Sequence, residues 1–159
     1  MSSSLWETLR RPEALYGDKP AYVDGDVSAT YRELADRCRR LAGALQASGV
    51  GLGDRVALLM ANGHRYLECY FAIPGMGAVM VPLNNRLAIP EFRYILEDAG
   101  VHTLIADETY ENLAVELASS VKQVIIGASA YEDAVASAAP AVMPVSVADL
   151  PTSWRASTA

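Results

Sequence analysis

The stretch RVALLMANGHRYLECYFAIPGMGAVMVPLNNRL, residues 55–87, decides the fold. It opens with an almost unbroken apolar run, Arg55–Met60, and closes with another, Ala78–Leu83, as is typical of strands buried on both faces of a parallel sheet. Between the runs, four apolar side chains recur at helical spacing, and we expect this helix face to cover the sheet. They are Tyr66, Leu67, Tyr70 and Phe71. Two parallel strands joined by a helix form a right-handed crossover unit.

The residues before this unit predict two helices and a hairpin. Residues 2–15 have the pattern of a short amphipathic helix that Pro12 breaks or bends. The Asp24-Gly25-Asp26 step between β-prone residues predicts a hairpin, because glycine adopts positive φ without steric cost. Thr30 and Glu33 then form a capping box at the start of a helix that ends at Gly49. The apolar stripe of this helix consists of Leu34, Cys38, Leu41 and Leu45.

The residues after the unit continue the alternation. A helix with Pro90 near its start precedes a strand at residues 103–106, and Asp107 is placed to cap the next helix. A further strand at residues 124–126 leads to a second candidate capping box, Ser129 to Glu132. Strands and helices alternate four times, which predicts an α/β fold with a mainly parallel sheet flanked by helices. We assign residues 1–137 to this folded unit, and residues 138–159, rich in Ala, Pro, Ser and Val, to a flexible, linker-like tail.

Composition restricts the class of protein. The chain has 159 residues, 52% apolar and 20% charged, with a net charge of −6, so we expect a globular domain that does not bind nucleic acid. Arg37, Arg39 and Arg40 share one helix, and we interpret them as a solvated face. The longest apolar run, residues 69–83, is too short to span a membrane, and the N-terminus does not have the pattern of a secretory signal. We therefore expect a cytoplasmic protein.

No constellation of residues supports catalysis, cofactor binding or metal binding unaided. His64 and His102 lie in unrelated elements without partners at metal-ligand spacing, and we interpret them as surface or packing residues. Cys38 and Cys69 fit small buried thiols. The glycines at 49, 51 and 53 follow a helix and precede a strand, whereas a dinucleotide loop follows a strand and opens a helix. We interpret them as a cap and a turn.

Three segments resemble the N-terminal part of acyl-CoA synthetases, members of the acyl-adenylate-forming, AMP-binding ligase superfamily. Thr30-Tyr31-Arg32-Glu33-Leu34 resembles the T-Y-x-E-L helix start of that family, and residues 51–57 resemble its G-x-G-D-R-V-A entry to a strand. Residues 71–87 resemble its F-A-x-x-x-x-G-A-V-x-V-P-L-N-x-R-L segment. The resemblance implies the first subdomain of the large N-terminal domain of a fatty-acid or carboxylic-acid–CoA ligase. Such an enzyme uses ATP, Mg²⁺ and coenzyme A to form an acyl adenylate and then a thioester.

The resemblance stops before the phosphate-binding loop of the family, which resembles T-S-G-T-T-G-x-P-K-G. Here residues 151–159 contain hydroxyl groups but neither glycine nor lysine. Glycine lets successive backbone amides approach a phosphate closely, so we expect a truncated fragment that is inactive alone and carries no catalytic, cofactor-binding or metal-binding residue. Ala88 replaces the Ser or Thr cap of the family, at a cost of about 1 kcal/mol.

Two further interpretations remain open. The chain is alternatively a non-catalytic interaction module derived from this fold, with a sheet edge or apolar face that self-associates as a homodimer. A separate complementing chain that supplies the missing loops is a third interpretation. An ordinary doubly wound nucleotide-binding protein ranks last, because it needs a glycine loop after a strand.

Overall fold

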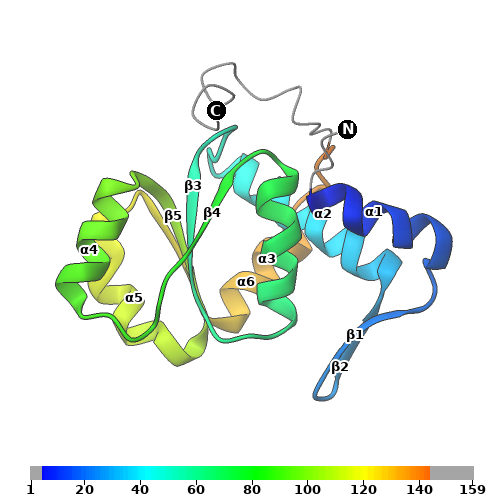
Figure 1. The fold of residues 1–159 in the computed structure, drawn as a ribbon, viewed down its shortest axis with the longest axis horizontal. Helices are drawn as coiled ribbons and strands as arrows, with labels where there is room; N and C mark the ends of the chain where they lie inside the picture. Colours follow the sequence, from blue (N-terminus) through cyan, green and yellow to red (C-terminus); the bar gives the residue numbers. More distant parts are fainter. Residues whose placement is uncertain (1–4, 144–159) are drawn as a thin grey trace.

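A computed structural model describes residues 5–143 (Figure 1). Its helices are α1 (Leu5–Tyr16), α2 (Tyr31–Ala47), α3 (His64–Gly75), α4 (Ile89–Asp98), α5 (Glu111–Leu117) and α6 (Gly127–Ser137), with 3₁₀ turns η1 (Glu108–Tyr110) and η2 (Ala118–Ser120). Its strands are β1 (Pro20–Asp24), β2 (Val27–Thr30), β3 (Arg55–Leu59), β4 (Val79–Pro82), β5 (Val101–Ala106) and β6 (Gln123–Ile126). No helix among these residues is long and apolar enough to cross a membrane.

Four parallel strands form the central sheet in the order β4-β3-β5-β6. Strand β3 lies inside the sheet and pairs with both β4 and β5, so Ala57 is opposite Val81 on one side and Leu104 on the other. The prediction of an α/β fold with a mainly parallel sheet is confirmed.

Helices cover both faces of the sheet (Figure 1). Helices α1, α2, α3 and α6 lie on one side, called here the four-helix face, and its buried core includes Trp6, Leu41 and Ile73. Helices α4 and α5 lie on the other side, the two-helix face, whose core includes Phe92 and Leu104.

The predicted hairpin and capping box are confirmed. β1 and β2 pair antiparallel, and the two-residue turn between them starts at Gly25 with a φ of 59°. The Thr30 Oγ1 accepts from the Glu33 amide at 3.2 Å, and the Glu33 carboxylate accepts from the Thr30 amide at 2.8 Å. Helix α1 remains continuous through Pro12, so the predicted break is absent; its Trp6 and Leu9 are buried in the four-helix core.

The predicted sheet-facing side of α3 is wrong. The buried residues of α3 are Glu68, Cys69, Ala72, Ile73 and Gly75. Tyr66, Leu67 and Phe71 are only half-buried, and Tyr70 is 38% exposed. Helix α3 packs against α1 and α2 as well as the sheet, so Tyr66, Leu67 and Phe71 lie at the margin of the four-helix core and Tyr70 is exposed.

The second predicted capping box is also wrong, because α6 begins at Gly127, before Ser129. The Ser129 hydroxyl lies 3.5 Å from the Asp133 carboxylate instead. After α6, residues 138–143 form an irregular segment in contact with α2. Residues 144–159, which include most of the predicted tail, lie outside the described residues.

Candidate functional site

The strand order indicates where to look for a site. Connections from β3 and β5 leave to opposite sides of the sheet, and ligands of open α/β sheets bind at the carboxyl ends of strands beside such a switch point. A crevice of about 250 Å³ lies there, between the loop after β3 and the turn after β5. A wider groove of about 800 Å³ adjoins it, beneath the β1–β2 hairpin and beside α2. His64 and Arg65 line both hollows.

The start of α3, which faces the crevice, is occupied by a carboxylate of the chain itself. Gly63 precedes the helix and offers no side-chain cap. The Oδ2 of Asp24, at the hairpin, accepts from the His64 amide at 2.9 Å and lies 2.8 Å from the His64 Nδ1. The hydrogen bonds from His64 lower the pKa of Asp24. The helix N-terminus, which would otherwise attract an anion, is therefore already neutralised.

His64 has the packing role that the sequence indicated. Its ring stacks on Tyr22 with 5.7 Å between the ring centroids. His102 lies on β5, and its Nδ1 is 2.9 Å from the Thr103 hydroxyl. Among residues 5–143, no three His, Cys, Asp or Glu side chains are grouped so that they could hold a metal ion.

Asp107, on the other side of the crevice, connects the loops that follow the carboxyl ends of β3 and β5. Its Oδ1 accepts from the Thr109 amide at 3.0 Å, and its Oδ2 accepts from the Ala61 amide at 2.5 Å. The predicted cap is confirmed, although it caps the 3₁₀ turn η1 and not an α-helix. Both oxygens of Asp107 are thus engaged in holding the loops.

A chain of ion pairs adjoins both hollows, since Arg37 and Glu132 line the groove, Glu108 lines the crevice, and Arg65 lines both. The Glu68 side chain is fully buried and accepts from the Arg37 Nε at 2.6 Å and the Tyr131 hydroxyl at 2.8 Å. Arg37 and Arg65 both bind Glu132, at 2.9 and 3.2 Å, and Arg65 also binds Glu108. Partial burial raises the pKa of Glu132, but the hydrogen bonds and charges of Arg37 and Arg65 outweigh it and hold that pKa below its ordinary value.

These pairs correct the interpretation of the basic residues of α2 as a solvated face. The Arg37 and Arg39 side chains are only 27% and 29% exposed. Arg39 binds Glu13 at 2.6 Å and lies over the Trp6 ring, while Arg40 binds Asp36. Glu132 likewise forms ion pairs with Arg37 of α2 and Arg65 of α3 and does not cap the start of α6. The partners of Arg37 and Arg39 come from distant parts of the chain, so helix periodicity did not reveal them.

The two cysteines are free and buried, as the sequence indicated. The Cys38 Sγ lies 3.6 Å from the Glu68 carbonyl oxygen, and the Cys69 Sγ lies 3.9 Å from the Tyr131 hydroxyl. Burial raises the pKa of Cys38, and it raises that of Cys69 to about 12. A neutral thiol is a poor nucleophile, so neither residue is suited to covalent catalysis.

Comparison with known proteins shows to which family the chain belongs. The AMP-binding enzyme family matches residues 9–151. The chain belongs to this family. It is 44% identical over 125 residues to a long-chain-fatty-acid–CoA ligase of Thermus thermophilus, covering 76% of this chain and 23% of that protein. It is 45% identical over 95 residues to a feruloyl-CoA synthase of an Amycolatopsis species, covering 60% of this chain and 19% of that protein.

Solved structures agree with the sequence relatives. The N-terminal domain of FACL13 from Mycobacterium tuberculosis superposes with a TM-score of 0.82 at 32% identity, covering 91% of this chain and 38% of that one. A benzoate CoA ligase from Burkholderia xenovorans superposes with a TM-score of 0.81 at 26% identity, covering 89% of this chain and 30% of that one. The chain thus corresponds to the N-terminal part of acyl-CoA ligases and spans about a fifth of the curated relatives' length.

The family segments identified in the sequence have structural roles in this member. Thr30 to Leu34 form the capped start of α2. In the second segment, the Gly51 amide donates to Asp54, while the Arg55 guanidinium donates to the Ala99 and Gly100 carbonyl oxygens at the end of α4. This arrangement ties β3 to α4 at the amino edge of the sheet.

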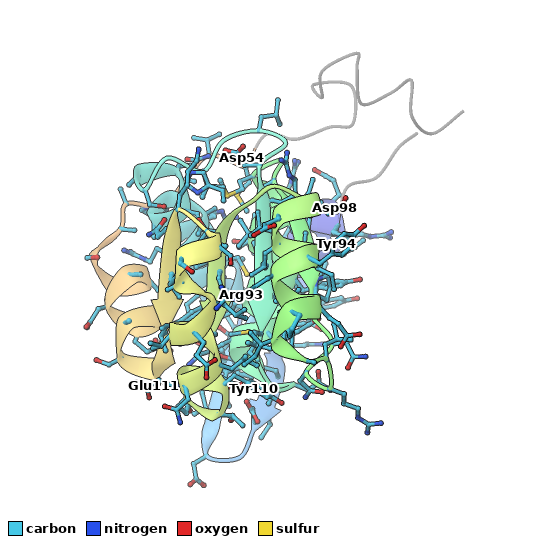
Figure 2. All side chains as sticks on the ribbon, turned by 90° about the vertical axis from the view of Figure 1, so that its left-hand side faces the viewer. Asp54, Arg93, Tyr94, Asp98, Tyr110 and Glu111 are labelled. Atoms are coloured by element: carbon cyan, nitrogen blue, oxygen red, sulfur yellow. The ribbon has the colours of Figure 1, made fainter. Side chains whose placement is uncertain are left out.

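The third segment ends in a polar turn after β4. The Asn84 Oδ1 accepts from the Arg86 amide at 3.1 Å, and the Asn85 side-chain amide contacts the Tyr110 hydroxyl. Tyr110 and Glu111 lie where η1 passes into α5 (Figure 2). The turn thus connects the carboxyl ends of β4 and β5.

Among residues 5–143, no turn between a strand and a helix contains a run of glycines. Gly63 stands alone between β3 and α3, and Gly127 is the first residue of α6, whereas a phosphate loop needs a run of amides in a glycine-rich turn. The start of α3 is filled by Asp24. Residues 151–159, where the family sequence would approach its phosphate loop, lie outside the described residues.

Proposed function

We propose that this chain is the N-terminal sheet subdomain of an ATP-dependent acid–CoA ligase and supplies scaffold, not catalytic groups. The observation that carries the proposal is the family match over residues 9–151. In addition, the carboxylates of Asp24 and Asp107, which line the crevice at the carboxyl edge of the sheet, are hydrogen-bonded within the chain. In the complete ligase, ATP and Mg²⁺ would support adenylation of a carboxylate, and coenzyme A would then displace AMP. No step of this reaction is assigned to residues 5–143.

The proposal extends to the location of the protein. Two buried free thiols suit a reducing compartment, and we place the chain in the cytoplasm on that basis.

Pyrophosphate release tests the central proposal. The purified chain is incubated with ATP, Mg²⁺, coenzyme A and a panel of a long-chain fatty acid, ferulic acid and 3-hydroxybenzoic acid, which reflects the names of the relatives. We expect release no greater than in the enzyme-free blank. The T. thermophilus ligase serves as the positive control for the fatty acid. Turnover by the chain alone would refute a scaffold role.

A second candidate function is self-association, and the exposed side of α3 favours it. Tyr70 is 38% exposed and packs edge to face with Phe71 at 5.6 Å between the ring centroids. Strand β4 is the adjacent edge strand of the sheet. The Val79 and Leu83 amides donate to the carbonyl oxygens of Asp54 and Leu58, at and just before β3. By alternation the backbone N–H of Met80 points to the open edge, where Pro82 has no N–H to offer. We therefore propose a two-fold dimer formed by side chains of α3 and not by strand addition.

Sedimentation equilibrium at several concentrations distinguishes the two candidates. A dimer should dissociate in Tyr70→Glu, which places a charge in the proposed interface. Tyr94→Glu is the matched control, because Tyr94 is 68% exposed on α4, on the other face (Figure 2). A wild-type monomer at all concentrations would contradict self-association. Adding a separately expressed C-terminal portion of a relative would test for a complementing chain by restored turnover.

A further inference from the structure

Residues 138–143 leave α6 in an irregular conformation and cross α2. The Ala141 amide donates to the Arg39 carbonyl oxygen of α2 at 2.9 Å. The Arg40 Nη1 donates to the Ala138 carbonyl oxygen at 3.2 Å. Ala141 and Met143 are half-buried and pack on the core of the four-helix face, whereas Val142 between them is 81% exposed. The alternation of docked and exposed residues indicates a specific contact along the helix.

Two helical glycines lie beneath this segment. A Cβ on Gly43, in the middle of α2, would lie 2.0 Å from the Ala139 carbonyl oxygen, a distance that two such atoms cannot adopt. A Cβ on Gly75, at the end of α3, would lie 2.6 Å from the Met143 Cε. Neither glycine has a positive φ. Glycine within a helix is less favourable than alanine, so close approach of residues 139–143 accounts for both positions.

The path of the segment determines where the chain continues. It starts at the end of α6, crosses α2 and reaches Gly75 and Trp6, where α3 and α1 meet. The adjacent Gly77 carbonyl oxygen accepts from the Gly53 amide just before β3, so this point lies at the amino edge of the sheet. Figure 1 shows the segment ending beside the start of α1, away from the hairpin. Asp24, which lines the crevice, belongs to that hairpin.

We propose that residues 138–143 are a docked strap that locks α6 onto α2 and fixes the amino edge as the point from which the chain continues. The strap extends the folded unit from Ser137 to Met143. Its anchor is the backbone contact at Gly43, and the Met143 side chain is a weaker second contact. This inference concerns the folded unit itself and does not depend on the ligase proposal.

Amide hydrogen exchange in the 159-residue chain, followed residue by residue by NMR, tests the strap. In the wild type, we expect the Ala141 amide to be protected and the exposed Val142 amide to exchange freely. In Gly43→Ala, the new methyl group must displace the Ala139 backbone, so the protection of Ala141 should be lost while amides in β3 and β5 remain protected. Alanine is the better helix former, so α2 itself should persist.

Two further glycine variants provide a weaker clash with the strap and a control without a clash. Gly75→Ala should leave Ala141 protected, because only the flexible end of Met143 must move. Gly51→Ala is the control away from the strap, where the new Cβ would have an ordinary 3.6 Å contact with Asp54. If Gly43→Ala fails to fold, Arg40→Met removes the bond to Ala138 without a clash and should lower Ala141 protection. Exchange of Ala141 as fast as Val142 in the wild type, or full protection in Gly43→Ala, would overturn the proposal.

Discussion

On the four-helix face of the sheet a fully buried carboxylate lies among apolar side chains, whereas the two-helix face has an apolar core. Glu68 is held by Arg37 from α2 and Tyr131 from α6, so one charge ties three helices together. On the other face, Phe92 and Leu96 of α4 pack on the sheet without a charge between them. Arg93 reaches from α4 to a carbonyl oxygen of α5 (Figure 2).

The difference between the two faces shows two ways in which the positions of helices on a sheet are fixed. The hydrophobic driving force that holds an apolar layer is not directional, so it depends on side-chain packing alone to set the positions of its helices. A buried carboxylate is stable only with its partners in place, so it fixes the relative positions of α2, α3 and α6. The four predictions that follow test this contrast.

Removing the guanidinium should have the largest effect. Arg37→Ala leaves the Glu68 carboxylate buried without its cation, and we expect a loss of about 3–5 kcal/mol in the free energy of unfolding. Urea denaturation measures it. The double variant Arg37→Leu/Glu68→Leu should recover most of the loss, because it removes the buried charge as well. A loss in Arg37→Ala below about 1 kcal/mol, the level of an exposed pair, would show that the carboxylate is not isolated from water.

The matched change on the two-helix face is Leu96→Ala. Leu96 is fully buried, so the cavity should cost about 2–5 kcal/mol in urea denaturation. Added salt should leave this cost unchanged, since no charge is exposed or removed. A cost that varied strongly with ionic strength would contradict the description of this face as apolar.

Substitution of the N-cap residue should change stability in opposite directions at α2, on the four-helix face, and at α4, on the two-helix face. The backbone at Ala88 (φ −80°, ψ 156°) matches that at Thr30 (φ −75°, ψ 166°), and Glu91 already accepts from the Ala88 amide at 2.7 Å. Thr30→Ala should therefore destabilise by about 1 kcal/mol, and Ala88→Ser should stabilise by up to about 1 kcal/mol. Thermal unfolding of both variants measures the changes. A loss of stability in Ala88→Ser would show that its turn cannot complete the capping box.

The smallest effect is expected from pH. The pKa of Glu132 in the folded chain is below its ordinary value of 4.5, so its stabilising contribution is present above that pH and is lost as the pH falls through the lowered value. Glu132 is 40% exposed, so we expect Glu132→Gln to cost less than about 1 kcal/mol at pH 7. The difference between variant and wild type in urea midpoints should shrink below pH 4.5. A constant difference would mean that the charge of Glu132 is not what stabilises α6.

The features predicted correctly from the sequence are those that depend on neighbouring residues. The Thr30–Glu33 box and the turn at Gly25 involve residues within four positions of each other, and the β3 and β5 strands each contain a short apolar run. The fold class followed from the order of such local signals, and the family resemblance followed from the amino-acid sequences of three segments.

The features that the sequence did not reveal depend on distant partners. Glu68 lies 31 positions from Arg37, and Arg37 lies 95 from Glu132, so no local pattern marks them as buried pairs. The face of α3 was misassigned for the same reason, because a buried glutamate contradicts an apolar stripe. Gly43 did carry a signal: a glycine in the middle of a well-capped helix indicates that another backbone approaches closely. The candidate crevice could not be predicted, since Asp24, His64 and Asp107 meet only through the topology.

The hairpin contact to α3 has a consequence for the order of folding. Asp24 stands 40 positions before His64, yet it completes the start of α3 by accepting the His64 amide. The first turn of α3 therefore cannot gain its cap until a loop of that length has closed, and loop closure is the slow, entropically costly step for contacts between distant residues. Helix α3 should nucleate at its buried middle and complete its first turn late, together with docking of the hairpin.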